Sequence, residues 1–162
     1  MKKQILVVED ERDMQFILAN ILKEKGYETI ITEDGHSALK EVKKGAVNLV
    51  LLDIKLPGMD GIKVLEKIKD IDKDLSVIML TASGDVRNSV RAMKLGATDY
   101  LTKPFETEEL VLTVKKALQT QYLSRKVERL RNRLREKTAA EEFMGLKIIP
   151  KQLKRLRNLL RF

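Results

Sequence analysis

Residues 49–61 read LVLLDIKLPGMDG, an apolar run that ends in a carboxylate and continues into a Pro-Gly turn. The run from Leu49 to Leu52 is apolar without alternation, which is typical of a central strand buried on both faces of a parallel sheet. Core packing does not explain a charged residue at the end of such a strand, because an unpaired buried charge is costly. Asp53 is therefore the first candidate functional residue.

Similar apolar runs recur along the chain, with stretches of helical period between them. We predict helices from Met14 to Lys25 and from Gly61 to Ile71. The predicted strands are Gln4–Val8, Thr29–Thr32, Leu49–Leu52, Ser76–Leu80 and Asp99–Thr102. The residues expected to face the core include Phe16, Ile17, Ile21, Leu22, Met79 and Met93. Five strands that alternate with helices predict an α/β fold, with right-handed crossovers and a parallel sheet covered on both faces.

The composition fits a soluble domain with residues to spare, since the 162 residues are 43% hydrophobic and 35% charged. The absence of cysteine excludes disulfides and thiolate metal sites and favours a reducing compartment. The N-terminal apolar run, Ile5 to Val8, is too short for a signal peptide, and no other segment is apolar enough to span a bilayer. We therefore expect a cytoplasmic protein with no membrane association.

The positive charge of the chain is confined to its C-terminal part. The formal net charge is +8, but residues 1–118 hold 19 Lys and Arg against 20 Asp and Glu, whereas residues 119–162 hold 13 against 4. The overall charge of the first part therefore gives no sign of polyanion binding. We interpret the basic segment from Arg125 to Arg135 as a solvated helix face, because aromatic residues are not interleaved with it.

One long helix is predicted near the C-terminus, since no Gly or Pro occurs between Phe105 and Met144. Its first part is expected to face the sheet with Leu110, Val114 and Ala117. Further on, apolar residues follow at the spacings 4, 3 and 4 of a coiled-coil seam: Leu123, Val127, Leu130 and Leu134. Residues 119–140 are therefore predicted to be a coiled-coil linker that forms a homodimer. A lone helix with a solvated arginine-rich face is the alternative.

Polar residues gather at the carboxyl ends of the predicted strands, where open parallel sheets bind ligands. These residues are Glu9, Asp10, Asp53, Thr81 and Lys103. Crowded carboxylates need a cation, and the hard ion Mg²⁺ takes one or two carboxylates while it keeps several waters. Lys103 can pair with Asp53 or with a phosphoryl group, and Thr81 offers a hydroxyl donor. Together they are the parts needed to transfer a phosphoryl group to a carboxylate.

Four stretches resemble the receiver domain of two-component response regulators: VVEDE at 7–11, LLDIKLPGMDG at 51–61, MLTAS at 79–83 and GATDYLTKPF at 96–105. The resemblance covers residues 1–118 and implies a flavodoxin-like, doubly wound five-stranded sheet in the order 2-1-3-4-5 with an extended C-terminal helix. It implies that Asp53 accepts a phosphoryl group from a sensor histidine kinase. The chain would then be no enzyme beyond its own Mg²⁺-dependent phosphorylation and dephosphorylation.

The same resemblance assigns a role to each site residue. The Mg²⁺ ligands would be the side chains of Glu9, Asp10 and Asp53 and the backbone carbonyl of Lys55. Thr81 and Tyr100 would form the switch pair, and Lys103 would contact the phosphoryl group. A cis peptide is expected before Pro104, since X-Pro bonds tolerate it. The family often has two aspartates in the first acidic pair, where this chain begins with Glu9.

Residues 141–162 form a basic amphipathic tail with turns at Gly145 and Pro150. The stretch FMGLKIIPKQLKRLRNLL at 143–160 is similar to the linker and the first residues of the ATPase domain in NtrC-type, sigma-54-dependent transcription activators. No GxxxxGK[ST] loop occurs, so the chain itself does not bind ATP in that manner. Either the tail begins a truncated ATPase domain, with the ATPase and DNA-binding parts absent from this chain, or the protein lacks them by nature.

The leading hypothesis is a signalling switch whose phosphorylation controls dimerisation and, through it, transcription. A stand-alone receiver whose basic tail binds a partner or nucleic acid is the alternative. A phosphatase with an aspartate nucleophile is a third hypothesis. Such enzymes carry a second aspartate two residues after the first, where this chain has Lys55.

Overall fold

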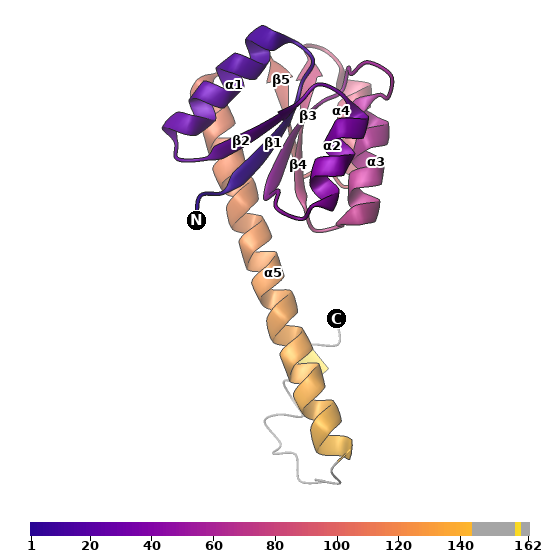
Figure 1. Cartoon of the computed structure of the whole chain (residues 1–162). Coiled ribbons are helices and arrows are strands. Elements are labelled where there is room, and N and C mark those ends of the chain that lie inside the picture. Colours follow the sequence, from indigo (N-terminus) through magenta and orange to yellow (C-terminus); the bar gives the residue numbers. More distant parts are fainter. Residues whose placement is uncertain (144–157, 160–162) are drawn as a thin grey trace. The chain divides into compact units, whose positions relative to one another are not determined.

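The computed structural model describes residues 1–143 and 158–159, and its centre is a five-stranded sheet (Figure 1). The strands are β1 (Gln4–Val8), β2 (Glu28–Thr32), β3 (Leu49–Asp53), β4 (Ser76–Ala82) and β5 (Asp99–Lys103). All neighbours pair in parallel, in the order β2-β1-β3-β4-β5. The predicted flavodoxin-like order is confirmed, and every residue of the central strand β3 is buried.

Helices cover both faces of the sheet (Figure 1). They are α1 (Arg12–Glu24), α2 (Gly35–Lys43), α3 (Gly61–Ile71), α4 (Val86–Lys94) and α5 (Thr107–Phe143). Alternate strand residues point to opposite sides, so the sheet divides the core into two clusters. One cluster contains side chains of α2, α3 and α4, and the other contains side chains of α1 and α5. This layering leaves the carboxyl ends of the strands free for a site.

The structure corrects two predictions about which residues face the core. In α1 the buried residues are Leu18 and Leu22, whereas Phe16 is 70% exposed and Ile17 is 46% exposed. Leu22 is buried and Ile21 packs against the same core cluster, as predicted, while Leu18 takes the place of Phe16 and Ile17. Met79 lies in the core as expected, but Met93 is 43% exposed, because α4 packs on the sheet with its small residues.

Helix α5 begins by packing on the sheet, as predicted, through the buried side chains of Leu110, Val114 and Ala117. It continues to Phe143, over 37 residues, and so includes the predicted linker. The chain divides into two compact units, Met1–Gln121 and Tyr122–Phe162. Apart from residues 158–159, the predicted tail from residue 144 onward lies outside the described residues. Among the helices that the structure describes, none is long and apolar enough to cross a membrane.

Candidate functional site

Three carboxylates meet at the carboxyl edge of the sheet. Glu9 directly follows β1 and is fully buried, Asp10 is exposed, and Asp53 is the buried last residue of β3. One carboxylate oxygen of each lies within 4.8 Å of the other two. The central position of β3, beside β1, makes this proximity inevitable once the strands pair in parallel.

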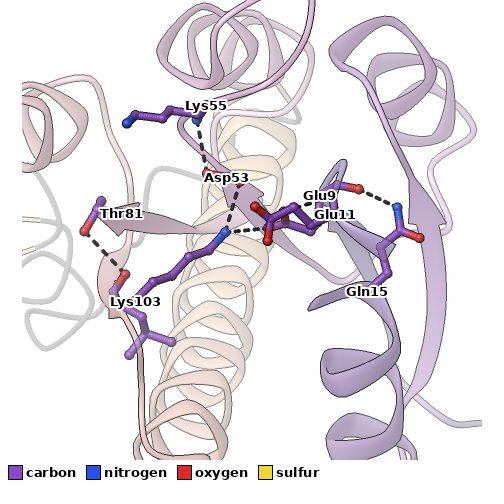
Figure 2. A network of polar contacts seen from close by, with 8 residues as sticks. Glu9, Glu11, Gln15, Asp53, Lys55, Thr81 and Lys103 are labelled. Atoms are coloured by element: carbon purple, nitrogen blue, oxygen red, sulfur yellow. Dashed lines mark hydrogen bonds and ion pairs between the residues drawn. The ribbon is translucent and has the colours of Figure 1, made fainter. Parts of the chain in front are cut away.

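Lys103 brings the compensating charge from the end of β5. Its Nζ donates to Glu9 Oε2 at 2.7 Å and to Asp53 Oδ2 at 3.0 Å, so the ammonium lies between the two carboxylates (Figure 2). The peptide bond from Lys103 to Pro104 is cis, as predicted. The three residues lie at the carboxyl ends of three different strands, and the sequence separations of 50 and 94 residues show that the fold assembles this ion-paired cluster.

The cluster keeps an excess of negative charge. Burial raises the pKa of Glu9 to about 7, with a further upward contribution from the charge of Asp53, while the hydrogen bond from Lys103 opposes the rise. Burial alone would lower the pKa of Lys103, but its bonds to Glu9 and Asp53 raise it. One ammonium faces three carboxylates, so the site favours a further cation.

Backbone contacts position Asp53 and the loop that follows it. The N–H of Lys55 donates to Asp53 Oδ1 at 3.1 Å (Figure 2). The loop then returns, so that the N–H of Gly61 donates to the carbonyl of Ile54 at 2.7 Å. A Cβ at Gly61 would collide with the carbonyl oxygen of Asp53 and lie 2.7 Å from the Cα of Ile54. Only glycine fits this close approach of two backbone segments.

Glu9 is held by groups that the sequence did not reveal. Its Oε1 accepts the backbone N–H of Glu11 at 3.3 Å, and its backbone carbonyl accepts Nε2 of Gln15 at 2.6 Å (Figure 2). Gln15 lies in the first turn of α1. The helix thereby fixes the chain just after β1, where the two acidic residues leave the sheet.

Thr81 and Tyr100 lie in a neighbouring hollow of about 490 Å³ between α4 and the strands β4 and β5. Thr81 is buried, and its hydroxyl donates to the carbonyl of Leu101 at 3.4 Å (Figure 2). Tyr100 is 44% exposed. Thus the structure brings the acidic residues and Lys103 together, and the two expected switch residues both line the neighbouring hollow. A second hollow, which we call the acidic hollow, is lined by Asp10, Asp53 and Lys103. Ala82 and Asp85 line both hollows.

Residues 5–115 match the family model of the response regulator receiver domain. The chain belongs to this family. Sporulation initiation phosphotransferase F of Bacillus subtilis is 39% identical over 118 residues, which cover 73% of this chain and 95% of that protein. The nitrogen assimilation regulatory protein NtrX of Azorhizobium caulinodans is 37% identical over 133 residues, which cover 81% of this chain and 29% of that protein.

Solved receivers share the fold. The crystal structure of NtrX from Brucella abortus matches with a TM-score of 0.76 and 39% identity, over 80% of this chain and 30% of that one. A CheY-like receiver domain protein from Methanospirillum hungatei matches with a TM-score of 0.73 and 32% identity, over 76% of this chain and 99% of that one. The chain spans about half (51%) of the transcriptional regulatory protein YkoG of Bacillus subtilis and less than a third of NtrX.

The residues of this receiver fit the metal ion that the family implies. Mg²⁺ requires hard oxygen ligands, and the three carboxylates offer them within 4.8 Å of one another. Asp10 lines the acidic hollow, so an ion and its waters can enter from solvent. Lys55 lines the same hollow.

Proposed function

We propose that this chain is a phosphorylation-activated response regulator in which Asp53 accepts a phosphoryl group from a sensor histidine kinase. The observation that carries the proposal is the position of Lys103 Nζ between Glu9 and Asp53, inside a cluster of three carboxylates. A structural ion pair needs one carboxylate for one ammonium. A Mg²⁺ ion would account for the additional acidic groups, and Glu9, Asp10, Asp53 and the carbonyl of Lys55 would hold it.

The transfer step follows from these groups. A carboxylate oxygen of Asp53 attacks phosphorus, a P–O bond forms, and the bond from phosphorus to the donor nitrogen of the kinase histidine breaks. The leaving imidazole keeps the electron pair of that bond. Lys103 stays beside Asp53 and pairs with the phosphoryl oxygens, while the N–H of Lys55 keeps the carboxylate oriented. Bound Mg²⁺ supplies charge neutralisation for the same oxygens.

Switching would begin at Thr81. Phosphorylation changes the charge at Asp53 from that of one carboxylate to about −2, and the phosphoryl oxygens attract the hydroxyl of Thr81. To respond, Thr81 gives up its 3.4 Å hydrogen bond to the carbonyl of Leu101 and vacates part of the hollow that it shares with Tyr100. Tyr100, now 44% exposed, can then turn inward. Phosphorylation would thus shift the population between two existing packings of α4 and β5.

The output that we propose is regulation of transcription. The names of the relatives support it, since PhoB of Escherichia coli, 38% identical over 117 residues, is a transcriptional regulatory protein. The apolar spacing of Leu123, Val127, Leu130 and Leu134 in α5 supports pairing of this helix with another helix. We also propose that ATPase and DNA-binding domains act downstream of this chain. The chain's own activity would be limited to its phosphorylation and dephosphorylation.

Labelling with acetyl phosphate tests the acceptor. In the presence of Mg²⁺ the intact protein should gain one phosphoryl group by mass spectrometry, and chelation by EDTA should prevent it. Asp53→Asn should abolish the gain, whereas the control Asp70→Asn, at an exposed position of α3, should retain it. Labelling of Asp53→Asn at the parent rate would refute the assignment.

A further inference from the structure

Within the described part of the second unit, α5 exposes an apolar stripe to solvent. Leu123 is 59% exposed, Val127 46%, Leu130 50% and Leu134 40%. Their spacing places all four on one side of the helix, over a length of about 16 Å. A row of large apolar side chains at these spacings is the contact surface of a helix that pairs with another helix. We call these four residues the seam.

The charges beside the seam are all of one sign. With Val127 and Leu134 at heptad position a and the other two seam residues at d, the charged residues at positions e and g are Lys126, Arg131 and Arg133. The remaining e and g positions between residues 124 and 140 hold Ser, Thr and Ala. The nearby glutamates lie at other positions: Glu128 at b and Glu136 at c. Positions e and g face the partner in a coiled coil and set partner choice.

A second copy of the chain is a poor match for this charge pattern. In a parallel pair, position g of one helix faces position e of the next heptad, so Lys126 would face Arg131 of the second copy, and the same contact would occur twice. An antiparallel pair sets e against e and g against g, which again joins basic residues. Like charges at these positions disfavour pairing and so act against self-association.

We propose that the seam binds a different helix, an amphipathic one with apolar residues at a and d and acidic residues at e and g. Opposite charges at these positions turn each repulsive contact into an attractive one. The chain's own tail does not have this chemistry, since residues 144–162 contain six basic residues and no acidic one. Nucleic acid would match the basic residues but not the apolar seam. This inference does not depend on phosphorylation of Asp53.

A peptide derived from the chain itself is the sharpest probe. The acidic peptide spans residues 120–140 with Lys126→Glu, Arg131→Glu and Arg133→Glu, and the reference peptide has the parent sequence. Both carry the same seam and differ in the flanking charges. Binding of each labelled peptide to the full unphosphorylated chain is measured by fluorescence anisotropy, and circular dichroism reports the helicity of each peptide.

The acidic peptide should bind about tenfold more tightly than the reference peptide at about 50 mM salt, and the difference should shrink at about 500 mM. The double variant Val127→Ser/Leu130→Ser of the full chain, changed at exposed positions, should lose the acidic peptide. Equal affinities for the two peptides would overturn the proposal. The proposal would also be overturned if the acidic peptide bound the double variant as tightly as the parent chain, or if a DNA duplex bound the double variant as tightly as the acidic peptide does. In either case, attraction between charges alone would explain the binding.

Self-association gives a second, independent test. The full chain should sediment as a monomer without phosphodonor, whereas Lys126→Glu should self-associate, because the new carboxylate would face Arg131 of a second copy. A parent dimer that Leu130→Ser dissociates would overturn the proposal and establish the homodimer instead. Dimerisation that Lys126→Glu weakens would contradict it as well.

Discussion

The burial of Glu9 makes the stability of the metal-free protein depend on pH. Its carboxylate is fully buried and shares Lys103 with Asp53, and burial is the main reason why its pKa rises from the ordinary 4.5 to about 7. The folded protein therefore resists ionisation of Glu9 more than the unfolded chain does. The substitution Glu9→Gln tests this, because glutamine has nearly the same shape as the protonated side chain and does not ionise in this range.

The direction and size of the effect follow from linkage. Since the folded pKa lies above the unfolded one, the stabilising contribution is complete below about pH 4.5 and is lost as the pH rises through about 7. The full loss corresponds to about 3 kcal/mol. Between about pH 5 and pH 8, the stability of Glu9→Gln relative to the parent should therefore increase by about 2 kcal/mol.

Urea unfolding followed by far-UV circular dichroism, in EDTA, measures this difference at each pH. The control is Glu66→Gln, an exposed position of α3, for which the difference from the parent should stay constant with pH. Added Mg²⁺ should stabilise the parent more than Glu9→Gln, because the variant has one carboxylate fewer. A difference between Glu9→Gln and the parent that does not change between about pH 5 and pH 8 would refute the reasoning.

Three further substitutions test the fold around the site by urea unfolding. Gly61→Ala should lower the free energy of unfolding by about 3 kcal/mol, because the new Cβ would collide with the carbonyl of Asp53. A loss below about 1 kcal/mol would contradict the close approach of the two backbone segments. Gln121→Ala should lower the free energy of unfolding by about 2 kcal/mol, because it removes the acceptor of a buried N–H in β4. The control Gln119→Ala, at an exposed position, should lower it by less than about 0.5 kcal/mol. Equal losses for the two variants would contradict a stabilising role of the buried hydrogen bond. Leu110→Ala should cost about 2–5 kcal/mol, and near-parental stability would mean that α5 does not pack as described.

The sequence did not reveal that Gln121 of α5 is buried and hydrogen-bonded. The spacing of Leu110, Val114 and Ala117 predicted correctly which side of the helix faces the sheet. It gave no sign that the next residue on that side is a buried amide. Gln121 accepts the N–H of Ser76 at 2.7 Å and donates to the carbonyl of Asn48 at 2.8 Å, and both partners are more than 40 residues away in the chain. Local patterns do not encode such long-range polar contacts.

The opposite case is α1, where a local pattern was present and misleading. Apolar residues occupy more than one side of this helix, and periodicity alone selected Phe16 and Ile17 for the core. The sheet buries Leu22, as predicted, but takes Leu18 in place of these two residues. The choice between overlapping stripes depends on how the helix axis lies over the strands, which is a property of the packed layers.

The sequence by itself determined the strands, their parallel pairing and the edge at which Glu9, Asp10, Asp53 and Lys103 gather, because alternating strands and helices put every strand's carboxyl end on one side. Only the tertiary structure decided that Lys103 reaches both Glu9 and Asp53, and that Glu9 is buried while Asp10 stays exposed. Side-chain reach and solvent access depend on the distances between strands and on the loops above them, and these are set by packing across the whole domain.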